Sequence, residues 1–174
     1  TDINDIAFDE EGNLWLALYG GLSRLEMNSD GRFTFATYVN DIDNPKSICS
    51  NRVINLAVLN GQVWAGTENG LVTYNSETDD FDNMTGENGL KDPNIISILS
   101  GNDNRLWFAT RQGLVAYNSR SSTLAYYNEQ DGIQAGSFTV RTAYKSKNGP
   151  LYFGGTNGYI KFANIKSNPN IPTI

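Results

Sequence analysis

A short pattern of residues recurs four times along the 174-residue chain. Each copy has an aromatic residue within an apolar run, a glycine six positions later, and then further apolar residues in alternation. The aromatic residues are Trp15, Trp64, Trp107 and Tyr152, and the glycines are Gly21, Gly70, Gly113 and Gly158. Successive copies lie 49, 43 and 45 residues apart. A fixed internal period of this size is typical of propellers and solenoids, so it constrains the fold more than any local pattern does.

Each copy is predicted to form up to four short antiparallel strands. Apolar and polar residues alternate in the strands, and Gly, Asn, Asp and Ser mark the turns between them. In the second copy, Asn69-Gly70 indicates a tight hairpin turn in which both residues have positive φ. No window has the sustained period of a helix, so the sequence predicts an all-β chain. The expected repeats cover residues 1–38, 53–84, 95–127 and 138–164.

Units of about 45 residues with four strands are typical of β-propeller blades. A blade cannot bury both of its faces alone, so neighbouring blades must stack. Because the anchor aromatic residues occupy the same mid-strand position in every copy, we expect them to pack between blades rather than to stack on sugars. Three apolar residues in the connecting segments, each five positions before the next predicted strand, are expected to fill the space between neighbouring blades. They are Ile48, Leu90 and Ile133.

The fourth copy differs from the others in two ways. It has two more residues between Phe138 and its anchor than the third copy has in the same interval, which predicts a β-bulge in its first strand. Its fourth strand is missing, and the chain continues through a polar stretch that contains Pro169 and Pro172. Because proline cannot donate to a sheet, residues 165–174 are interpreted as an exit linker toward a following domain.

The composition excludes several classes of function. The net charge is −6 and no basic stripe is present, so neither nucleic acid nor a membrane surface is an expected partner. The sequence contains no histidine, which removes Ser-His and Cys-His catalytic systems, histidine metal ligands and a phospho-accepting histidine from this chain. Cys49 is the single cysteine and is expected to be a small, partly buried side chain rather than a nucleophile. No metal and no cofactor are predicted.

Acidic residues gather at several predicted turns. Asp9 and Asp103 lie on hairpin turns with few carboxylates, whereas a calcium site needs about six to eight converging oxygens. Residues 77–82 hold four acidic side chains and are predicted to form a solvated turn. Turn chemistry is therefore the favoured interpretation of these carboxylates.

Three copies share a more specific pattern. It consists of Gly12-Asn13-Leu14-Trp15-Leu16-Ala17 in the first, Val63-Trp64-Ala65-Gly66-Thr67 with Gly70-Leu71 in the second, and Leu106-Trp107-Phe108-Ala109-Thr110 with Gly113-Leu114 in the third. These segments resemble the two-component regulator propeller repeat, and residues 143–159 resemble the terminal repeat of that family. The first copy departs from the family pattern, because Leu18-Tyr19 precedes its glycines where the family usually has Gly-Thr.

The resemblance implies a setting for the chain. Such repeats form the periplasmic sensor region of hybrid two-component histidine kinases, especially in Bacteroidetes, and the kinase lies elsewhere in the parent protein. A propeller of this family has about seven blades, so four copies are expected to be a fragment of a larger propeller. The expected partners are then the remaining blades and the downstream domain. The open blade faces of an isolated fragment would also favour self-association, for example by the pairing of two copies.

Binding residues are expected in loops at one end of the propeller. The turns between second and third strands share this end with the segments that connect the blades. Polar and aromatic groups that converge there suit a small oligosaccharide, so the predicted function is non-catalytic sensing of a carbohydrate breakdown product. The candidate ligand-binding residues are Tyr19, Glu68, Asn69, Arg111, Gln112 and Asn157.

Two other functions remain open at this point. One is a propeller enzyme acting on glycans, either a lyase or a glycosidase; the absence of histidine counts against lyases that act on streptogramins. Nothing in the sequence identifies one pair of carboxylates as the catalytic pair that glycoside hydrolysis needs. The other alternative is a protein-binding scaffold, a role that many propellers have.

Overall fold

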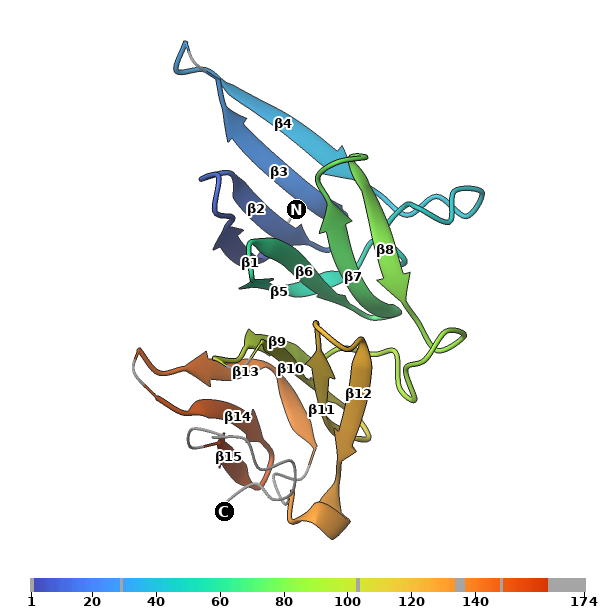
Figure 1. The fold of residues 1–174 in the computed structure, drawn as a ribbon, viewed down its shortest axis with the longest axis vertical. Coiled ribbons are helices and arrows are strands. Elements are labelled where there is room, and N and C mark those ends of the chain that lie inside the picture. The colour runs from blue at the N-terminus through green and yellow to red at the C-terminus, as the bar shows by residue number, and fades with distance from the viewer. Residues whose placement is uncertain (1, 29, 103, 134–136, 148, 163–174) are drawn as a thin grey trace. The chain divides into compact units, whose positions relative to one another are not determined.

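The structure is a computed structural model that describes residues 2–28, 30–102, 104–133, 137–147 and 149–162. These residues form four antiparallel sheets, which confirms the predicted all-β fold of successive blades (Figure 1). The chain divides into two compact units, Thr1–Ile95 and Ile96–Ile174, and each is described by itself. No helix in the described ranges is long and apolar enough to cross a membrane. The predicted exit linker, residues 165–174, lies outside them.

Unit 1 contains two four-stranded sheets, which we call blade 1 and blade 2. In each sheet the strands lie side by side in sequence order. Blade 1 consists of β1 (Ile3–Phe8), β2 (Leu14–Leu18), β3 (Gly21–Met27) and β4 (Phe33–Tyr38). Blade 2 consists of β5 (Val53–Leu59), β6 (Gln62–Thr67), β7 (Gly70–Asn75) and β8 (Asp80–Met84).

Unit 2 contains blade 3 and blade 4, again with strands in sequence order. Blade 3 consists of β9 (Ser97–Ser100), β10 (Arg105–Thr110), β11 (Gly113–Asn118) and β12 (Thr123–Tyr127). A one-turn 3-10 helix, η1 (Glu129–Asp131), follows it. Blade 4 consists of β13 (Phe138–Lys145), β14 (Leu151–Gly155) and β15 (Gly158–Phe162). Residues 163–174, where a fourth strand would follow, are outside the described part of the chain.

The first strands of blades 1, 2 and 4 carry irregularities. The register of β13 against β14 shifts between Phe138 and Ala143, as the two extra residues predict. Similar shifts lie between Ile3 and Asp5 in β1 and between Val53 and Asn55 in β5, and the spacing of the repeats did not predict these.

The β6–β7 turn differs from the prediction. Gly70 has a φ of 150°, but Asn69 does not have a positive φ, so the expectation for this residue pair is wrong. Among the described residues, the Asn-Gly pair in which both residues have positive φ is Asn60-Gly61, with values of 53° and 76°, between β5 and β6. Gly70 is needed for another reason: a Cβ atom there would lie 2.5 Å from the carbonyl oxygen of Met84 on the fourth strand.

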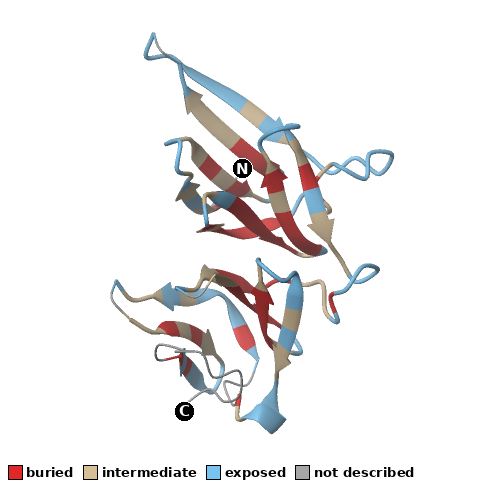
Figure 2. Cartoon of the chain, in the orientation of Figure 1, coloured by how far each residue is buried: buried red, intermediate tan, exposed pale blue. Residues whose placement is uncertain are grey.

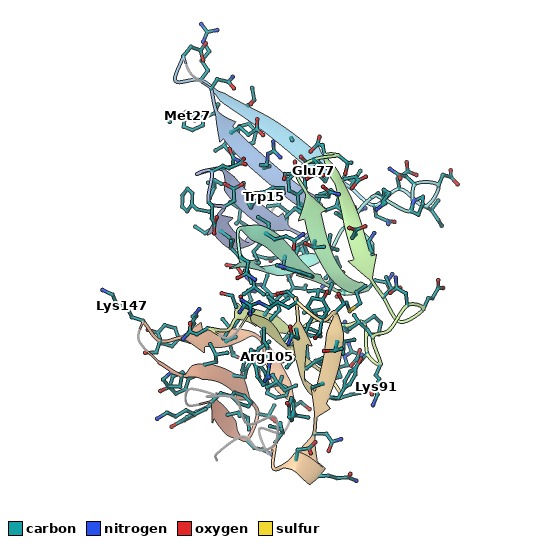
Figure 3. All side chains as sticks on the ribbon, in the orientation of Figure 1. Trp15, Met27, Glu77, Lys91, Arg105 and Lys147 are labelled. Carbon is teal, nitrogen blue, oxygen red and sulfur yellow. The ribbon has the colours of Figure 1, made fainter. Side chains whose placement is uncertain are left out.

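The core of unit 1 lies between its two sheets. We define the forward face of a blade as the face that carries its anchor aromatic residue, and the backward face as the opposite one. The forward face of blade 1 contributes Trp15, Ala17 and Leu22 to the core, and Trp15 is fully buried (Figure 3). Ile48 from the connecting segment joins this cluster and is also fully buried, as predicted. The backward face of blade 2 contributes Leu56, Val63, Ala65, Val72, Tyr74 and Phe81.

Unit 2 repeats this arrangement. The forward face of blade 3 contributes Trp107, Ala109, Leu114 and Ala116, and the backward face of blade 4 contributes Leu151, Phe153, Ile160 and Phe162. Ile133 from the connecting segment is buried in the same cluster. Figure 2 shows many of the buried residues on β5, β6 and β7 of blade 2 and on β10 and β11 of blade 3, whereas β4 and β12 carry none.

The anchors of blades 2 and 4 differ in burial. Trp64 is buried. Tyr152 is only half-buried, and it lies beside the exposed Tyr144 and Tyr159, with ring centroids 6.2 and 5.9 Å away. The expected packing of an anchor between two blades is therefore not seen for Tyr152 within the described ranges.

The Asp9 carboxylate holds the first turn of blade 1 and the anchor of that blade. Its Oδ1 atom accepts hydrogen bonds from the backbone amides of Asn13 (2.8 Å) and Glu11 (3.1 Å). Its Oδ2 atom accepts from the Trp15 indole nitrogen (2.9 Å) and the Asn13 side chain (3.0 Å). Burial raises the pKa of Asp9, but the hydrogen bonds from Trp15, Asn13 and Glu11 outweigh it, so the pKa lies below its usual value. Asp103, the other carboxylate assigned to a turn, is not among the described residues.

Replacing Gly70 by alanine is expected to lower the free energy of unfolding by about 2–4 kcal/mol, because the new methyl group meets the Met84 carbonyl at an unfavourable φ. Gly158→Ala should cost less, since Gly158 has a φ of 129° but no atom within 4 Å of the added Cβ. Gly86→Ala is the control, because its nearest atoms lie at 3.8 Å and its φ is not positive. Urea denaturation of the three variants tests this. Equal losses for Gly70→Ala and Gly158→Ala would show that the close approach contributes nothing.

Replacing Asp9 by asparagine is expected to lower the free energy of unfolding by about 1 kcal/mol at pH 7, because an uncharged amide is a weaker acceptor for the Trp15 indole. The folded-state pKa of Asp9 is below the unfolded one, so this stabilisation is complete above about pH 4 and is lost as the pH falls through the folded pKa. The difference between Asp9→Asn and the natural protein should therefore shrink by pH 3 in urea denaturation. The exposed Asp2→Asn is the control, and a difference that persists at pH 3 would contradict the assignment.

Candidate functional site

The six candidate ligand-binding residues all lie in turns between the second and third strands of their blades. Tyr19 is in the β2–β3 turn, and Glu68 and Asn69 form the β6–β7 turn of unit 1. In unit 2, Arg111 and Gln112 form the β10–β11 turn and Asn157 is in the β14–β15 turn. Glu68 is half-buried and the other five residues are exposed. Each unit therefore presents its own group of candidate residues.

In unit 1 the structure brings Tyr19 and Glu68 to the same cation, Arg52. The Arg52 guanidinium carbon lies 4.9 Å from the centroid of the Tyr19 ring. Its Nη1 atom lies 3.1 Å from Oε1 of Glu68. All three side chains keep contact with solvent: Tyr19 is 40% exposed, and the side chains of Arg52 and Glu68 are 54% and 36% exposed. This group, which we call the Arg52 cluster, offers an aromatic ring, a cation and a carboxylate within one short stretch of surface.

Hydrogen bonds within the turns fix the backbone that carries the candidate side chains. The buried Thr67 hydroxyl donates to the Gly70 carbonyl (2.8 Å) and accepts from the Asn69 amide (3.1 Å). Thr110 makes the same two bonds, to the Gly113 carbonyl and from the Gln112 amide, each at 3.2 Å. The second and third copies thus hold their turns with a threonine at the equivalent position. Blade 1 has Leu18 at this position, which is the departure from the repeat noted in the sequence.

Asn69 is tied to the connecting segment of its unit. Its side-chain amide donates to the carbonyl of Cys49 at 3.3 Å. The Cys49 thiol itself lies 3.4 Å from the Thr67 hydroxyl, and burial raises its pKa. A half-buried thiol with a raised pKa is a weak nucleophile, which agrees with the structural role expected of Cys49.

In unit 2 Arg111 and Gln112 line a pocket of about 350 Å³. The pocket lies between the β10–β11 turn and the segment that connects blade 3 to blade 4. Its apolar lining comes from Ile133 and Phe138, which are buried side chains of the unit 2 core. The complete lining is Arg111, Gln112, Gly113, Asn128, Glu129, Gln130, Ile133 and Phe138.

The polar lining of this pocket is held in place by η1. Asn128 caps the helix: its side-chain oxygen accepts from the Gln130 amide (2.8 Å), and its own amide donates to the Asp131 carboxylate (3.0 Å). The Ile133 amide donates back to the Asn128 carbonyl at 3.1 Å. With one arginine and one glutamate, the lining has balanced charge, and three side-chain amides supply both donors and acceptors. This chemistry suits a neutral polar ligand.

Asn157 is not part of the pocket lining. The neighbouring Thr156 amide donates to the Ser137 carbonyl at 3.0 Å, so the β14–β15 turn is fixed to the same connecting segment from another side. Within unit 1 the structure groups Tyr19 with Glu68, and within unit 2 it groups Arg111 with Gln112 and leaves Asn157 outside the pocket lining.

Sequence reasoning missed the residues that the connecting segments contribute. Arg52 and Gln130 come from these segments, and neither belongs to the repeated pattern. Asn128 and Asp131 could have been found, because an Asn followed three residues later by an acidic residue is a recognisable capping pattern. Arg52 carries no such signal.

A second pocket, of about 480 Å³, lies in unit 1. It is at the strand ends opposite to the β2–β3 and β6–β7 turns. Its acidic side chains come from the hairpin turn of Asp9 and from the start of the acidic segment 77–82, which the sequence analysis interpreted as a solvated turn. Nowhere in the described part of the chain do three or more His, Cys, Asp or Glu residues form a group that could hold a metal ion. The lining is Asp9, Glu10, Glu11, Asn60, Gly61, Gln62, Val63, Tyr74, Asn75, Ser76 and Glu77.

The nearby Asp79 carboxylate links the two blades of unit 1. It accepts hydrogen bonds from the hydroxyls of Tyr38 in blade 1 (2.7 Å) and Tyr74 in blade 2 (2.8 Å). Arg24 lies 3.9 Å from it and donates to the Tyr74 hydroxyl. The hydrogen bond from Tyr38 is the main cause that holds the pKa of Asp79 below its usual value, while burial raises the pKa of Tyr38. Because the polar groups of these side chains bond to one another, we assign the cluster a structural role.

Comparison with known proteins gives one family and several similar structures. Residues 89–112 match the family model described as two component regulator propeller. No curated protein sequence matches the chain. The extracellular domain assigned to the hybrid two component system BT3049 from B. thetaiotaomicron is 26% identical, with a TM-score of 0.74. The match covers 90% of this chain and 21% of that one, so the chain spans about a fifth of its relative.

Two further structures share the fold. The extracellular domain assigned to the one component system BT4673 from B. thetaiotaomicron is 17% identical with a TM-score of 0.56, and the match covers 92% of this chain and 26% of that one. A streptogramin B lyase is also 17% identical, with a TM-score of 0.64, and the match covers 93% and 51% of the two chains. The chain therefore contains a segment that matches the two component regulator propeller repeat, and it has the fold of a portion of a larger propeller, similar to that of the extracellular domain assigned to the hybrid two component system BT3049.

Proposed function

We propose that the chain is a ligand-sensing segment of a periplasmic two-component sensor and that its ligand is a small, neutral oligosaccharide. The observation that carries this proposal is the pocket in unit 2. It combines apolar side chains at Ile133 and Phe138 with amide groups at Gln112, Asn128 and Gln130. A sugar presents apolar C–H faces and neutral hydroxyls, and such a pocket offers a partner for each of them.

The polar groups of the pocket are arranged before a ligand arrives. The cap of η1 fixes Asn128, Glu129 and Gln130, and Thr110 fixes the backbone of the Arg111-Gln112 turn. Ordering these groups costs little on binding, which favours affinity for a small ligand. The Arg52 cluster in unit 1 supplies a second set of sugar-compatible groups, with the Tyr19 ring for stacking and Glu68 as an acceptor.

The proposed role is non-catalytic, and the kinase would lie elsewhere in the parent protein. The likeness to the BT3049 extracellular domain supports a sensor. The likeness to a streptogramin B lyase supports only a common fold at its level of identity. The sequence has no histidine to act as a general base, and both carboxylates with a lowered pKa, Asp9 and Asp79, are engaged in structural hydrogen bonds.

The test is isothermal titration calorimetry with the whole extracellular domain of the parent protein and a panel of neutral oligosaccharides. One glycan is expected to bind, and Gln112→Ala is expected to weaken its affinity at least about tenfold, because the substitution removes a donor and an acceptor from the pocket. Arg111→Ala should also weaken binding.

The matched control is Arg120→Ala. Arg120 is an exposed arginine of the same blade, and it lies in the β11–β12 turn at the far end of β11 from the pocket. Its replacement should leave the affinity unchanged. The proposal fails if no glycan of the panel binds. It also fails if the Gln112→Ala and Arg120→Ala variants bind the glycan with equal affinity. Turnover of a glycan would instead establish an enzyme.

A further inference from the structure

The apolar part of the unit 2 pocket is small. It consists of the exposed fractions of Ile133 and Phe138, which are 4% and 8%. A phenylalanine side chain has about 150–250 Å² of surface, so an exposed fraction of 8% leaves on the order of 20 Å² for a ligand. The Phe138 ring is held in the core, where it makes a T-shaped contact with the fully buried Phe153 at a centroid distance of 6.4 Å. The pocket therefore offers an apolar contact of about the size of a methyl group.

A hydrogen-bond donor of fixed orientation lies on the same short segment. The Oδ1 atom of Asn128 accepts from the Gln130 backbone amide (2.8 Å) in the cap of η1, so the cap determines which end of the Asn128 amide is the oxygen. The Nδ2 group makes no hydrogen bond to a residue of the described ranges and is left to donate to a ligand. The Ile133 amide donates to the Asn128 carbonyl at 3.1 Å, which keeps this donor close to the apolar contact.

The Gln130 side chain supplies the complementary group. It lines the pocket, and within the described part of the chain its amide makes no hydrogen bond, so it can accept from a ligand as well as donate to it. The charges of the lining, on Arg111 and Glu129, are opposite and cancel. The pocket thus combines a methyl-sized apolar contact, a donor of fixed orientation and a neighbouring acceptor, without net charge.

We infer that the pocket selects a sugar that carries an acetamido group, an inference that rests on the proposed function. In this arrangement the acetamido methyl group contacts Ile133 and Phe138. Its carbonyl oxygen accepts from Nδ2 of Asn128, and its N–H group donates to the side chain of Gln130. A hydroxyl in place of the acetamido group would leave the apolar contact unfilled or set a polar group against it. The volume of about 350 Å³ is near the lower end of the range of small-molecule sites and suits a single sugar residue of this kind.

Matched pairs of sugars test the inference by isothermal titration calorimetry with the whole extracellular domain of the parent protein. The members of each pair differ only in having an acetamido group or a hydroxyl next to the anomeric carbon. The pairs are N,N′-diacetylchitobiose with cellobiose, N-acetyllactosamine with lactose, and N-acetylgalactosamine with galactose. We expect the acetamido member of at least one pair to bind at least about tenfold more tightly than its partner.

The possible failures of this test separate the inference from the proposed function. If no pair shows a preference for the acetamido member while some neutral glycan binds, the inference is wrong and the proposed function stands. If no glycan of any kind binds, the proposed function is wrong as well. This comparison uses the natural protein and does not depend on the folding of a variant.

The substitution Asn128→Asp tests the assigned donor. It removes the Nδ2 group but keeps the cap, because a carboxylate oxygen still accepts from the Gln130 amide. We expect it to weaken binding of the acetamido sugar at least about tenfold. The matched control is Asn118→Asp, which adds the same charge at the far end of β11, where Oδ1 of Asn118 accepts from the Arg120 amide at 2.9 Å. Equal affinities of the two variants, with both shown to be folded by thermal unfolding, would overturn the assignment.

Discussion

The structure depends on one contact, made in the same way in both units: the forward aromatic face of one blade packs against the backward apolar face of the next. Trp15 and Trp107 lie at the centre of these contacts and are 0% and 2% exposed. Burying an indole removes about 150–250 Å² from water, which corresponds to an upper limit of about 4–6 kcal/mol per tryptophan. A single blade has no such partner, so each sheet is stable only as part of a stack. The hydrogen bond from Trp15 to Asp9 adds orientation, because it fixes the indole at the turn where β2 begins.

Much of this fold could be predicted because the repeated residues are those that make the contact between blades. The tryptophan and the glycine six positions later each have a separate steric cause. The tryptophan fills the space between blades, and the glycine lets the third strand begin against the carbonyl of the fourth, as at Gly70 and Met84. The predicted turn type at Asn69-Gly70 was wrong because the glycine is required by the close approach of the fourth strand and not by the turn. Tyr152 shows the limit of the pattern: it shares the register of the tryptophans, but it is only half-buried beside two exposed tyrosines.

The candidate site was less predictable, since its partners come from outside the repeat. The turn residues could be located from the register alone. However, Arg52 reaches Tyr19 and Glu68 from a connecting segment, and the distance of 4.9 Å between its guanidinium carbon and the Tyr19 ring depends on how that segment folds. The same holds for Gln130, which is placed in the pocket by the capped helix η1. Connecting segments differ in length and sequence between copies, so no internal comparison can locate their side chains in advance.

The turns themselves explain how one repeat can combine a constant frame with variable recognition. In blades 2 and 3 the residues before and after the two central turn positions are the same, threonine and glycine, and they make equivalent hydrogen bonds. The central pair is Glu68-Asn69 in one and Arg111-Gln112 in the other, with opposite charge. The threonine hydroxyl holds the turn in both blades, whereas none of the four central residues belongs to the buried cores between the blades. Because the cost of such a change to folding is small, the residues of the proposed binding site can vary independently of the core.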